Sequence, residues 1–250
     1  MAIREDAQRN HDALFPGHVS TLRETDPELI EVFDNWAFGD VLADTTLDVR
    51  TRLMVQLASL IACHAVGEYR VMLGAALHVG VTPVEAKEIL YQAVPYVGMA
   101  RVFDFLGVTN EVLQERGVEL PLPPQSSTTN ETRFDHGLAV QKRILGETID
   151  RLYAESPKDQ LHVQRFLSAN CFGDYLTRTG IELKVRELLT LSMLASLGGC
   201  EPQLAGHVAA NLAVGNDRAV LISVVTQLLP FIGYPRALNA LRVIHEGTSS

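Results

Sequence analysis

The stretch Leu57-Ala-Ser-Leu60-x-x-Cys63 recurs later in the chain as Leu194-Ala-Ser-Leu197-x-x-Cys200. Two further pairs show nearly the same spacing. Gln92-x-x-Pro95-x-x-Gly98-x-x-Arg101 recurs as Gln227-x-x-Pro230-x-x-Gly233-x-x-Arg236, and Phe38-Gly-Asp40 recurs as Phe172-Gly-Asp174. The copies lie about 135 residues apart, which is the size of a domain and not of a solenoid repeat. The sequence therefore predicts a duplicated fold in which Cys63 matches Cys200 and Pro95 matches Pro230.

Both copies have the pattern of helices. Apolar residues recur at helical spacing, whereas alternating β-branched stretches are scarce. Helix starts are marked by two capping-box patterns, Thr82-Pro-Val-Glu85 and Thr179-Gly-Ile-Glu182. We therefore expect an all-α protein with about six helices in each copy. The expected ranges are 5–14, 26–37, 46–62, 66–79, 83–96 and 99–116 in the first copy, and 131–153, 157–171, 181–198, 202–214, 217–230 and 235–245 in the second.

The chain divides between the copies. Residues 121–130 are rich in proline and then polar, without hydrophobic periodicity, which is typical of a linker. We expect a first repeat over 1–120 and a second over 131–250. The second repeat carries Glu187, Gln203 and His207, and the first shows no matching Glu or His, so the candidate active site is expected in the second repeat.

Composition excludes several classes of protein. Of the 250 residues, 47% are hydrophobic and the net charge is −9, which argues against nucleic acid as a partner. No uninterrupted apolar run reaches the ~18 residues that a transmembrane helix needs, so no membrane partner is expected. The N-terminus lacks the apolar core of a signal peptide. Three scattered cysteines are too few for a disulfide scaffold, so a cytoplasmic, reduced location is expected.

The helix predicted around residues 185–197 is apolar on most of its circumference, so all its sides need cover. Stacking of the two copies would provide part of that cover, and self-association the rest. We therefore expect a homo-oligomer with closed symmetry. A compact monomer is the alternative.

Glu187 stands on the apolar stripe of its predicted helix, between Leu183 and Leu191. A carboxylate in that position needs a partner or takes up a proton more readily, and such carboxylates are common both at functional sites and in structural ion pairs. Gln203 and His207 follow one helical turn apart on the next helix and would share a face. These three residues should converge on one apolar pocket, with Cys200 at or near its rim.

Three other residues are candidates with open alternatives. Cys200 precedes a helix N-terminus, which favours a thiolate, but buried structural cysteines are common. Arg186 and Arg236 could bind a substrate carboxylate, or could form salt bridges between helices. One Glu, one His and one Cys without zinc-type spacing predict no metal site.

The stretches Val185-Arg-Glu-Leu-Leu-Thr-Leu-Ser-Met-Leu-Ala-Ser-Leu197, Gln203-Leu-Ala-Gly-His207 and Pro230-Phe-Ile-Gly-Tyr-Pro-Arg-Ala237 resemble the carboxymuconolactone decarboxylase family. Val49 through Arg101 resembles a diverged member. The resemblance implies an all-helical alkyl hydroperoxidase D-like fold and ring assembly, commonly as hexamers of single domains. A tandem chain would then form a homotrimer that is a pseudo-hexamer, with a dimer as the alternative.

The resemblance also implies two activities. The decarboxylase branch, which acts in aromatic catabolism, would make the chain a carboxy-lyase for 4-carboxymuconolactone or a related unsaturated lactone or carboxylic acid. No cofactor is needed if the substrate's own carbonyl accepts the electrons. Glu187 and His207 would move the proton, Gln203 would donate to the oxyanion, and Arg186 or Arg236 would hold a carboxylate. The peroxidase branch would act through Cys200, but Gln203 stands where its second cysteine would be. A helical protein without catalysis, or with an unrelated tailoring activity, is the third possibility.

Overall fold

The computed structural model describes residues 2–249, and over this range the chain is all-α, with no strand. The first repeat contributes α1 (Glu5–Leu14), α2 (Leu22–Thr25), α3 (Pro27–Asp34), η1 (Asn35–Asp40), α4 (Val41–Ala43), α5 (Val49–Ala62), α6 (Val66–His78), α7 (Pro83–Val97) and α8 (Met99–Glu115). The second contributes α9 (Arg133–Leu145), α10 (Thr148–Glu155), α11 (Leu161–Phe166), η2 (Leu167–Leu176), α12 (Leu183–Leu197), α13 (Glu201–Ala213) and α14 (Arg218–Thr248). Residues 116–132 join them without forming a helix.

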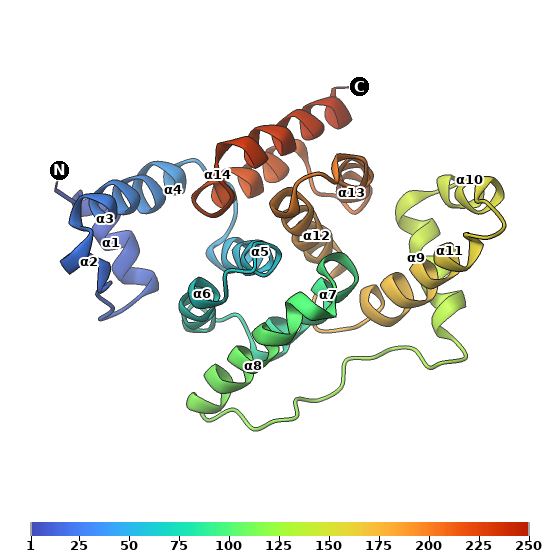
Figure 1. The fold of residues 1–250 in the computed structure, drawn as a ribbon, viewed down its shortest axis with the longest axis horizontal. Coiled ribbons are helices and arrows are strands. Elements are labelled where there is room, and N and C mark those ends of the chain that lie inside the picture. The colour runs from blue at the N-terminus through green and yellow to red at the C-terminus, as the bar shows by residue number, and fades with distance from the viewer. Residues whose placement is uncertain (1, 250) are drawn as a thin grey trace.

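Helices α5 and α12 lie side by side at the centre of the molecule (Figure 1). Their buried serines meet there, with 2.7 Å between Ser59 Oγ and Ser196 Oγ. Each repeat also packs onto the other's central helix, because α7 contacts α12 and α14 contacts α5. One hydrophobic core therefore spans both repeats.

The repeated glutamine explains part of the sequence motif. Gln92 Nε2 on α7 donates to the backbone oxygen of Arg186 at 2.7 Å. Gln227 Nε2 on α14 donates to the backbone oxygen of Val41 at 2.6 Å. Both amides are buried, so these bonds satisfy polar groups that would otherwise be left unpaired. Gln92 of the first repeat thus binds the second repeat, and Gln227 of the second repeat binds the first.

The helix bounds give the register between the repeats. α6 starts at Val66 and α13 at Glu201, while α7 starts at Pro83 and α14 at Arg218. Both pairs differ by 135 positions, and the predicted match of Pro95 with Pro230 is confirmed.

In this register Cys63 corresponds to Gly198, and Cys200 corresponds to Ala65. The predicted match of the two cysteines is therefore wrong by two residues. The two Leu-Ala-Ser-Leu stretches occupy different turns of their helices, although both pack in the same core.

Two helical hairpins lie at opposite ends of the molecule, one made by α1 and η1 and the other by α9 and η2 (Figure 1). In each, the aspartate of the repeated Phe-Gly-Asp binds an arginine: Asp40 binds Arg4 and Asp174 binds Arg133, both at 2.8 Å. The glycine permits close approach, since a Cβ on Gly173 would lie 2.0 Å from the backbone oxygen of Arg133. The motif therefore positions the two hairpins.

Several helix bounds differ from the sequence prediction for local reasons. The expected helix over 131–153 breaks at Gly146, whose φ is 63°. The helices expected over 26–37 and 157–171 continue as π-helical turns, which hydrophobic periodicity does not report. The capping box at Thr82 is confirmed. At the second predicted box Thr179 instead bonds Gln125, and Glu182 starts α12 without a side-chain cap.

Helix α14 is long and apolar enough to cross a membrane by length and composition, with a mean hydropathy of 1.3. Its backbone is not continuous, because Gly233 has non-helical dihedral angles. The part before Gly233 belongs to the shared core and packs on α5 and α12. We therefore interpret α14 as two consecutive core helices.

Candidate functional site

Glu187 and His207 are in direct contact. Glu187 lies on the second turn of α12 and is completely buried, and its Oε2 is 2.8 Å from His207 Nδ1 on α13. The His207 side chain keeps 16% of its surface exposed. Because the carboxylate engages Nδ1, it fixes the orientation of the imidazole and leaves Nε2 as the atom that can exchange a proton.

The second oxygen of Glu187 has no partner. Oε1 is buried, and no residue among 2–249 donates a hydrogen bond to it. An unpaired buried carboxylate oxygen is costly, and native proteins rarely keep one outside a functional site or a site for a water molecule. The Asn211 side chain on α13 donates from Nδ2 to the backbone oxygen of Glu187 at 3.1 Å, which joins α12 to α13 beside the pair. The same Nδ2 also donates to the backbone oxygen of His207.

Tyr96 completes the surroundings from the first repeat. Its ring meets the His207 ring edge-on, with 5.8 Å between centroids. Burial raises the pKa of the Tyr96 hydroxyl well above its ordinary value, and Cys171 and Glu187 add to the effect. The hydroxyl therefore stays protonated and can act as a hydrogen-bond donor.

Cys171 on η2 lies 3.8 Å from the Tyr96 hydroxyl. Burial raises the pKa of its thiol to about 12, so the thiol is uncharged where it borders the site. It belongs to a small apolar cluster with Ile144, Phe172, Leu176 and Ala210. The Glu187–His207 pair thus lies among α12, α13, η2 and the end of α7.

The sequence analysis singled out neither Tyr96 nor Cys171. Tyr96 directly follows the repeated Pro95, and its counterpart in the register of the helix bounds is Phe231. The difference between tyrosine and phenylalanine at matched positions was therefore a usable signal. Cys171 gave no such signal, because its approach depends on the π-helical turn of η2.

Gln203 lies one turn before His207 on α13 and is exposed. It makes no side-chain hydrogen bond with the rest of residues 2–249. Its amide is therefore free to bind a ligand beside the exposed edge of His207, and its predicted role as an oxyanion donor stays a prediction.

Arg186 is completely buried and joins the two repeats. Its Nη2 donates to Glu88 Oε2 at 2.8 Å, its Nη1 to Gln92 Oε1 at 3.0 Å, and its Nε to the backbone oxygen of Ile181. Burial lowers the pKa of Arg186, and Glu88 opposes this effect. Each guanidinium nitrogen of Arg186 therefore donates a hydrogen bond to an acceptor within the protein. The predicted binding of a substrate carboxylate by Arg186 stays a prediction.

Cys200 and Arg236 lie at the other end of α12. Ten residues of helix, roughly 15 Å at 1.5 Å per residue, separate Glu187 from Leu197 at that end. Cys200 Sγ donates to the backbone oxygen of Leu194 at 3.2 Å, in a small pocket that Arg236 also lines. Cys200 is the N-cap residue of α13, two turns before His207, and its expected place at the rim of the Glu187 site stays a prediction.

The Cys200 thiol is not activated. Burial raises its pKa, and Glu201 raises it further. All three cysteines are free. Arg236 Nη1 lies 3.9 Å from Cys63 Sγ, in an open hollow that Arg101 and His64 also line. Over residues 2–249 no group of three His, Cys, Asp or Glu side chains is placed to hold a metal ion.

Two comparisons relate this arrangement to known proteins. The model of the carboxymuconolactone decarboxylase family matches residues 27–111 and 162–246, two segments in the same register as the helix bounds. A 4-carboxymuconolactone decarboxylase of Acinetobacter baylyi (strain ATCC 33305 / BD413 / ADP1) is 27% identical over 118 residues, which is 47% of this chain and 87% of that protein.

Proposed function

Because the chain belongs to the carboxymuconolactone decarboxylase family, with two tandem copies of its domain, we propose that it is a cofactor-free decarboxylase of an unsaturated lactone acid such as 4-carboxymuconolactone. The observation that carries the proposal is the buried Glu187 carboxylate bonded to Nδ1 of a partly exposed histidine. This arrangement suits controlled transfer of one proton at the edge of an apolar site.

The reaction needs an electron acceptor and a proton donor. The bond between the ring carbon and the carboxylate breaks, CO2 leaves, and the electron pair passes into the conjugated lactone carbonyl as a dienolate. Protonated His207 then delivers its Nε2 proton to carbon, and the imidazole regains a proton from solvent. The net change is loss of CO2 and uptake of one proton, so no oxidant or external electron acceptor is required.

The surrounding residues have separate tasks in this proposal. Glu187 orients His207 through Nδ1 and leaves Nε2 on the side that the substrate would occupy. Gln203 on the exposed side is placed to donate to the lactone oxygen, where negative charge develops. Tyr96 and the apolar cluster around Cys171 exclude water from the side of the carboxylate. We place the reaction in the cytoplasm, in keeping with three free cysteines.

Redox chemistry through Cys200 is the weaker alternative. It needs a thiolate and a resolving thiol, whereas the pKa of Cys200 is raised and Gln203 occupies the third position after it. A non-catalytic role, or an unrelated tailoring activity, gives no reason for the buried Glu187 Oε1 to lack a hydrogen-bond partner.

The direct test is the ultraviolet absorbance of 4-carboxymuconolactone after mixing with the protein, with released CO2 measured in parallel. His207→Ala should remove most turnover, because the proton donor is lost. His78→Ala is the matched control, since His78 is an exposed helical histidine on α6. Equal turnover by the two variants would exclude His207 as the donor. No CO2 release by the parent protein, with this acid or related lactone acids, would overturn the proposal.

A further inference from the structure

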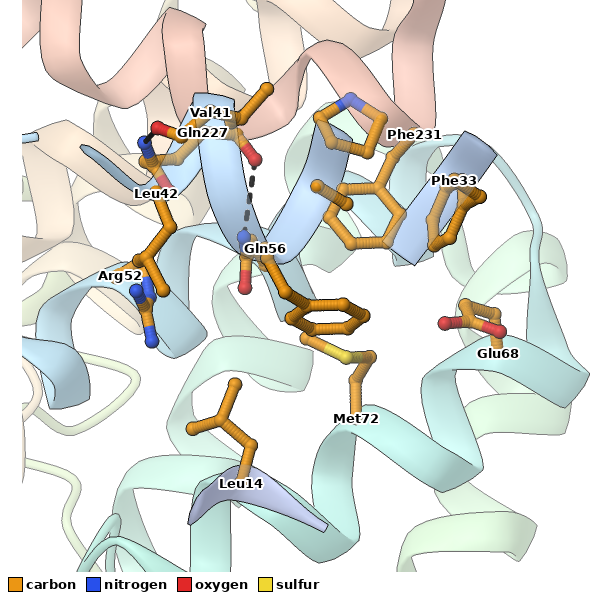
Figure 2. Close-up of a pocket in the computed structure, with 13 residues that line it drawn as sticks. Leu14, Phe33, Val41, Leu42, Arg52, Gln56, Glu68, Met72, Gln227 and Phe231 are labelled. Atoms are coloured by element: carbon orange, nitrogen blue, oxygen red, sulfur yellow. Dashed lines mark hydrogen bonds between the residues drawn. The ribbon is translucent and has the colours of Figure 1, made fainter. Parts of the chain in front are cut away.

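The first repeat contains a cavity at the position that corresponds to the Glu187–His207 pair (Figure 2). The cavity lies among α5, α6, the N-terminal helices and α14, has about 40 Å³ of room for water-sized molecules, and opens to solvent. Its walls are mainly apolar, with Phe33, Phe38, Met72 and Phe231 as the large side chains. This first-repeat cavity is distinct from the site of the proposed decarboxylation.

The first-repeat cavity has lost the groups for proton transfer. Met72 stands where the second repeat has His207, 135 positions later. Arg52 is the first buried residue of α5, as Arg186 is of α12, so it lies on the helical turn that corresponds to Arg186 and Glu187. Phe231 replaces Tyr96. The first-repeat cavity therefore has no histidine and presents a guanidinium beside a thioether, an arrangement that can bind an anion.

Arg52 is a buried cation without a partner. Its side chain lines the first-repeat cavity, and the residue is 7% exposed. Among residues 2–249 no side chain or backbone group forms a hydrogen bond or ion pair with its guanidinium. Burial lowers the pKa of Arg52, and no neighbouring acid offsets that effect. The guanidinium nitrogens are not among the fully enclosed atoms that lack a partner, so Arg52 can be reached by a ligand that enters the cavity.

The polar groups nearby are already fixed. Gln56 Nε2 donates to the backbone oxygen of Gln227 at 3.1 Å, and Gln227 Nε2 donates to Val41 (Figure 2). These bonds hold α5, α14 and α4 together, so the cavity wall beside Arg52 is preorganised. Glu68 also lines the cavity and is exposed. A second negative charge on a ligand would meet this carboxylate, which favours a monoanion over a dianion.

We propose that the first-repeat cavity binds a small cyclic monocarboxylate, with the carboxylate on Arg52 and the ring against Met72, Phe38 and Phe231. The planar guanidinium suits a carboxylate because it can donate two parallel hydrogen bonds. The phenylalanines suit the flat face of an aromatic or unsaturated ring. The site binds and does not transform its ligand.

The test uses benzoate as the probe, measured by calorimetry and by the fluorescence of Trp36, the single tryptophan of the chain. Trp36 lies in η1, next to the segment that lines the cavity. Benzoate should bind, whereas benzamide, which has the same shape without the charge, should bind at least about tenfold more weakly. Isophthalate, with two carboxylates, should also bind more weakly.

Two variants locate the binding. Arg52→Met should weaken benzoate by about 10- to 100-fold, because a hydrogen-bonded charge pair is lost. Arg52→Lys should keep part of the affinity. His207→Ala should keep the full affinity, which separates this cavity from the second-repeat site and makes the result independent of any decarboxylase activity.

Thermal unfolding gives a second readout. Benzoate should raise the melting temperature of the parent protein but not of Arg52→Met, and Arg52→Met should itself melt no lower than the parent, because an unpaired buried charge is removed. If Arg52→Met does not fold, or melts well below the parent, Arg52 has a structural partner and the proposal is wrong. Equal affinity for benzoate and benzamide, no benzoate binding at millimolar concentration, or loss of binding in His207→Ala alone would equally overturn it.

Discussion

The two repeats share a fold, but their corresponding sites hold different polar groups. In the second repeat a buried carboxylate, Glu187, is bonded to a histidine. In the first repeat a buried guanidinium, Arg52, lines a cavity beside a methionine. The remaining walls are built alike, from a helical hairpin and from the α7 or α14 segment of the other repeat. Duplication has thus kept the architecture while the second copy alone retains groups that can move a proton.

The comparison also shows how the two repeats depend on each other. Each site is completed by an aromatic residue from the other repeat, Tyr96 in one case and Phe231 in the other. Neither repeat would form its site alone, because the residue after the repeated proline crosses to its neighbour. This dependence is a reason for keeping both copies in one chain.

The largest expected effect on stability is at Arg186, the first buried residue of α12. Arg186→Met should lower the free energy of unfolding by about 3–5 kcal/mol, because it leaves the buried Glu88 carboxylate with Arg178 as its remaining partner.

Arg50→Met is the control, because Arg50 pairs with Glu85 at the surface, where loss of an ion pair costs about 0–1 kcal/mol. Urea unfolding measures both variants. Equal free energies of unfolding for Arg186→Met and Arg50→Met would show that the buried ion pairs between the repeats do not stabilise the fold.

A smaller effect, on kcat, is expected when Tyr96 is changed to phenylalanine, the residue type of its counterpart Phe231. Tyr96→Phe should lower kcat by up to about tenfold, because one hydrogen-bond donor is lost beside Glu187 and His207. Tyr69→Phe removes another buried hydroxyl, bonded to Thr109 at 2.8 Å, and should leave kcat unchanged. If both variants keep the kcat of the parent, Tyr96 serves packing alone.

The exposed apolar residues repeat in the same register as the sites. Met99 and Phe103 on α8 correspond to Tyr234 and Leu238 on α14, and all four are exposed. Equivalent apolar faces on both repeats suit a closed ring in which each chain supplies two similar contacts. We therefore predict a homotrimer, with a mass about three times 27.5 kDa by light scattering.

Phe103→Glu combined with Leu238→Glu should lower that mass to one chain. A parent protein that is monomeric at micromolar concentration would contradict the assembly, and a dimer would require a different use of the two faces.

The smallest effect is expected at Cys200. Cys200→Ser should leave kcat close to that of the parent, because the thiol lies at the other end of α12 and donates to a backbone oxygen. Its raised pKa also predicts slow alkylation by iodoacetamide near neutral pH, where thiolate is scarce. Loss of all activity in Cys200→Ser would favour redox chemistry instead.

Much of this arrangement follows from local sequence rules. Duplication and helical periodicity predicted the two all-α repeats, and the burial of Glu187 on an apolar stripe, together with the one-turn spacing of Gln203 and His207, predicted which residues to examine. The π-helical turns and the crossing of α7 onto α12 depend on packing between distant segments. For that reason the roles of Tyr96, Cys171 and Arg52 could not be predicted from spacing.

The register error has the same origin. Leu57-Ala-Ser-Leu60 and Leu194-Ala-Ser-Leu197 are alike because both lie in one shared core, where small and large apolar residues alternate, and not because they occupy equivalent turns. With the cysteines misaligned by two residues, the match of His207 with Met72 was hidden. Local similarity is a poor guide to register when both copies pack against each other.

The central claim is that proton transfer belongs to the second repeat alone, and Glu187→Gln tests it most directly. The amide keeps the size of the side chain but removes the charge that supports protonated His207. Turnover of 4-carboxymuconolactone should fall by at least about 100-fold in kcat. Glu111→Gln, at an exposed glutamate on α8, should keep the kcat of the parent. If Glu187→Gln also turns over at the parent rate, the account of the second-repeat site is contradicted.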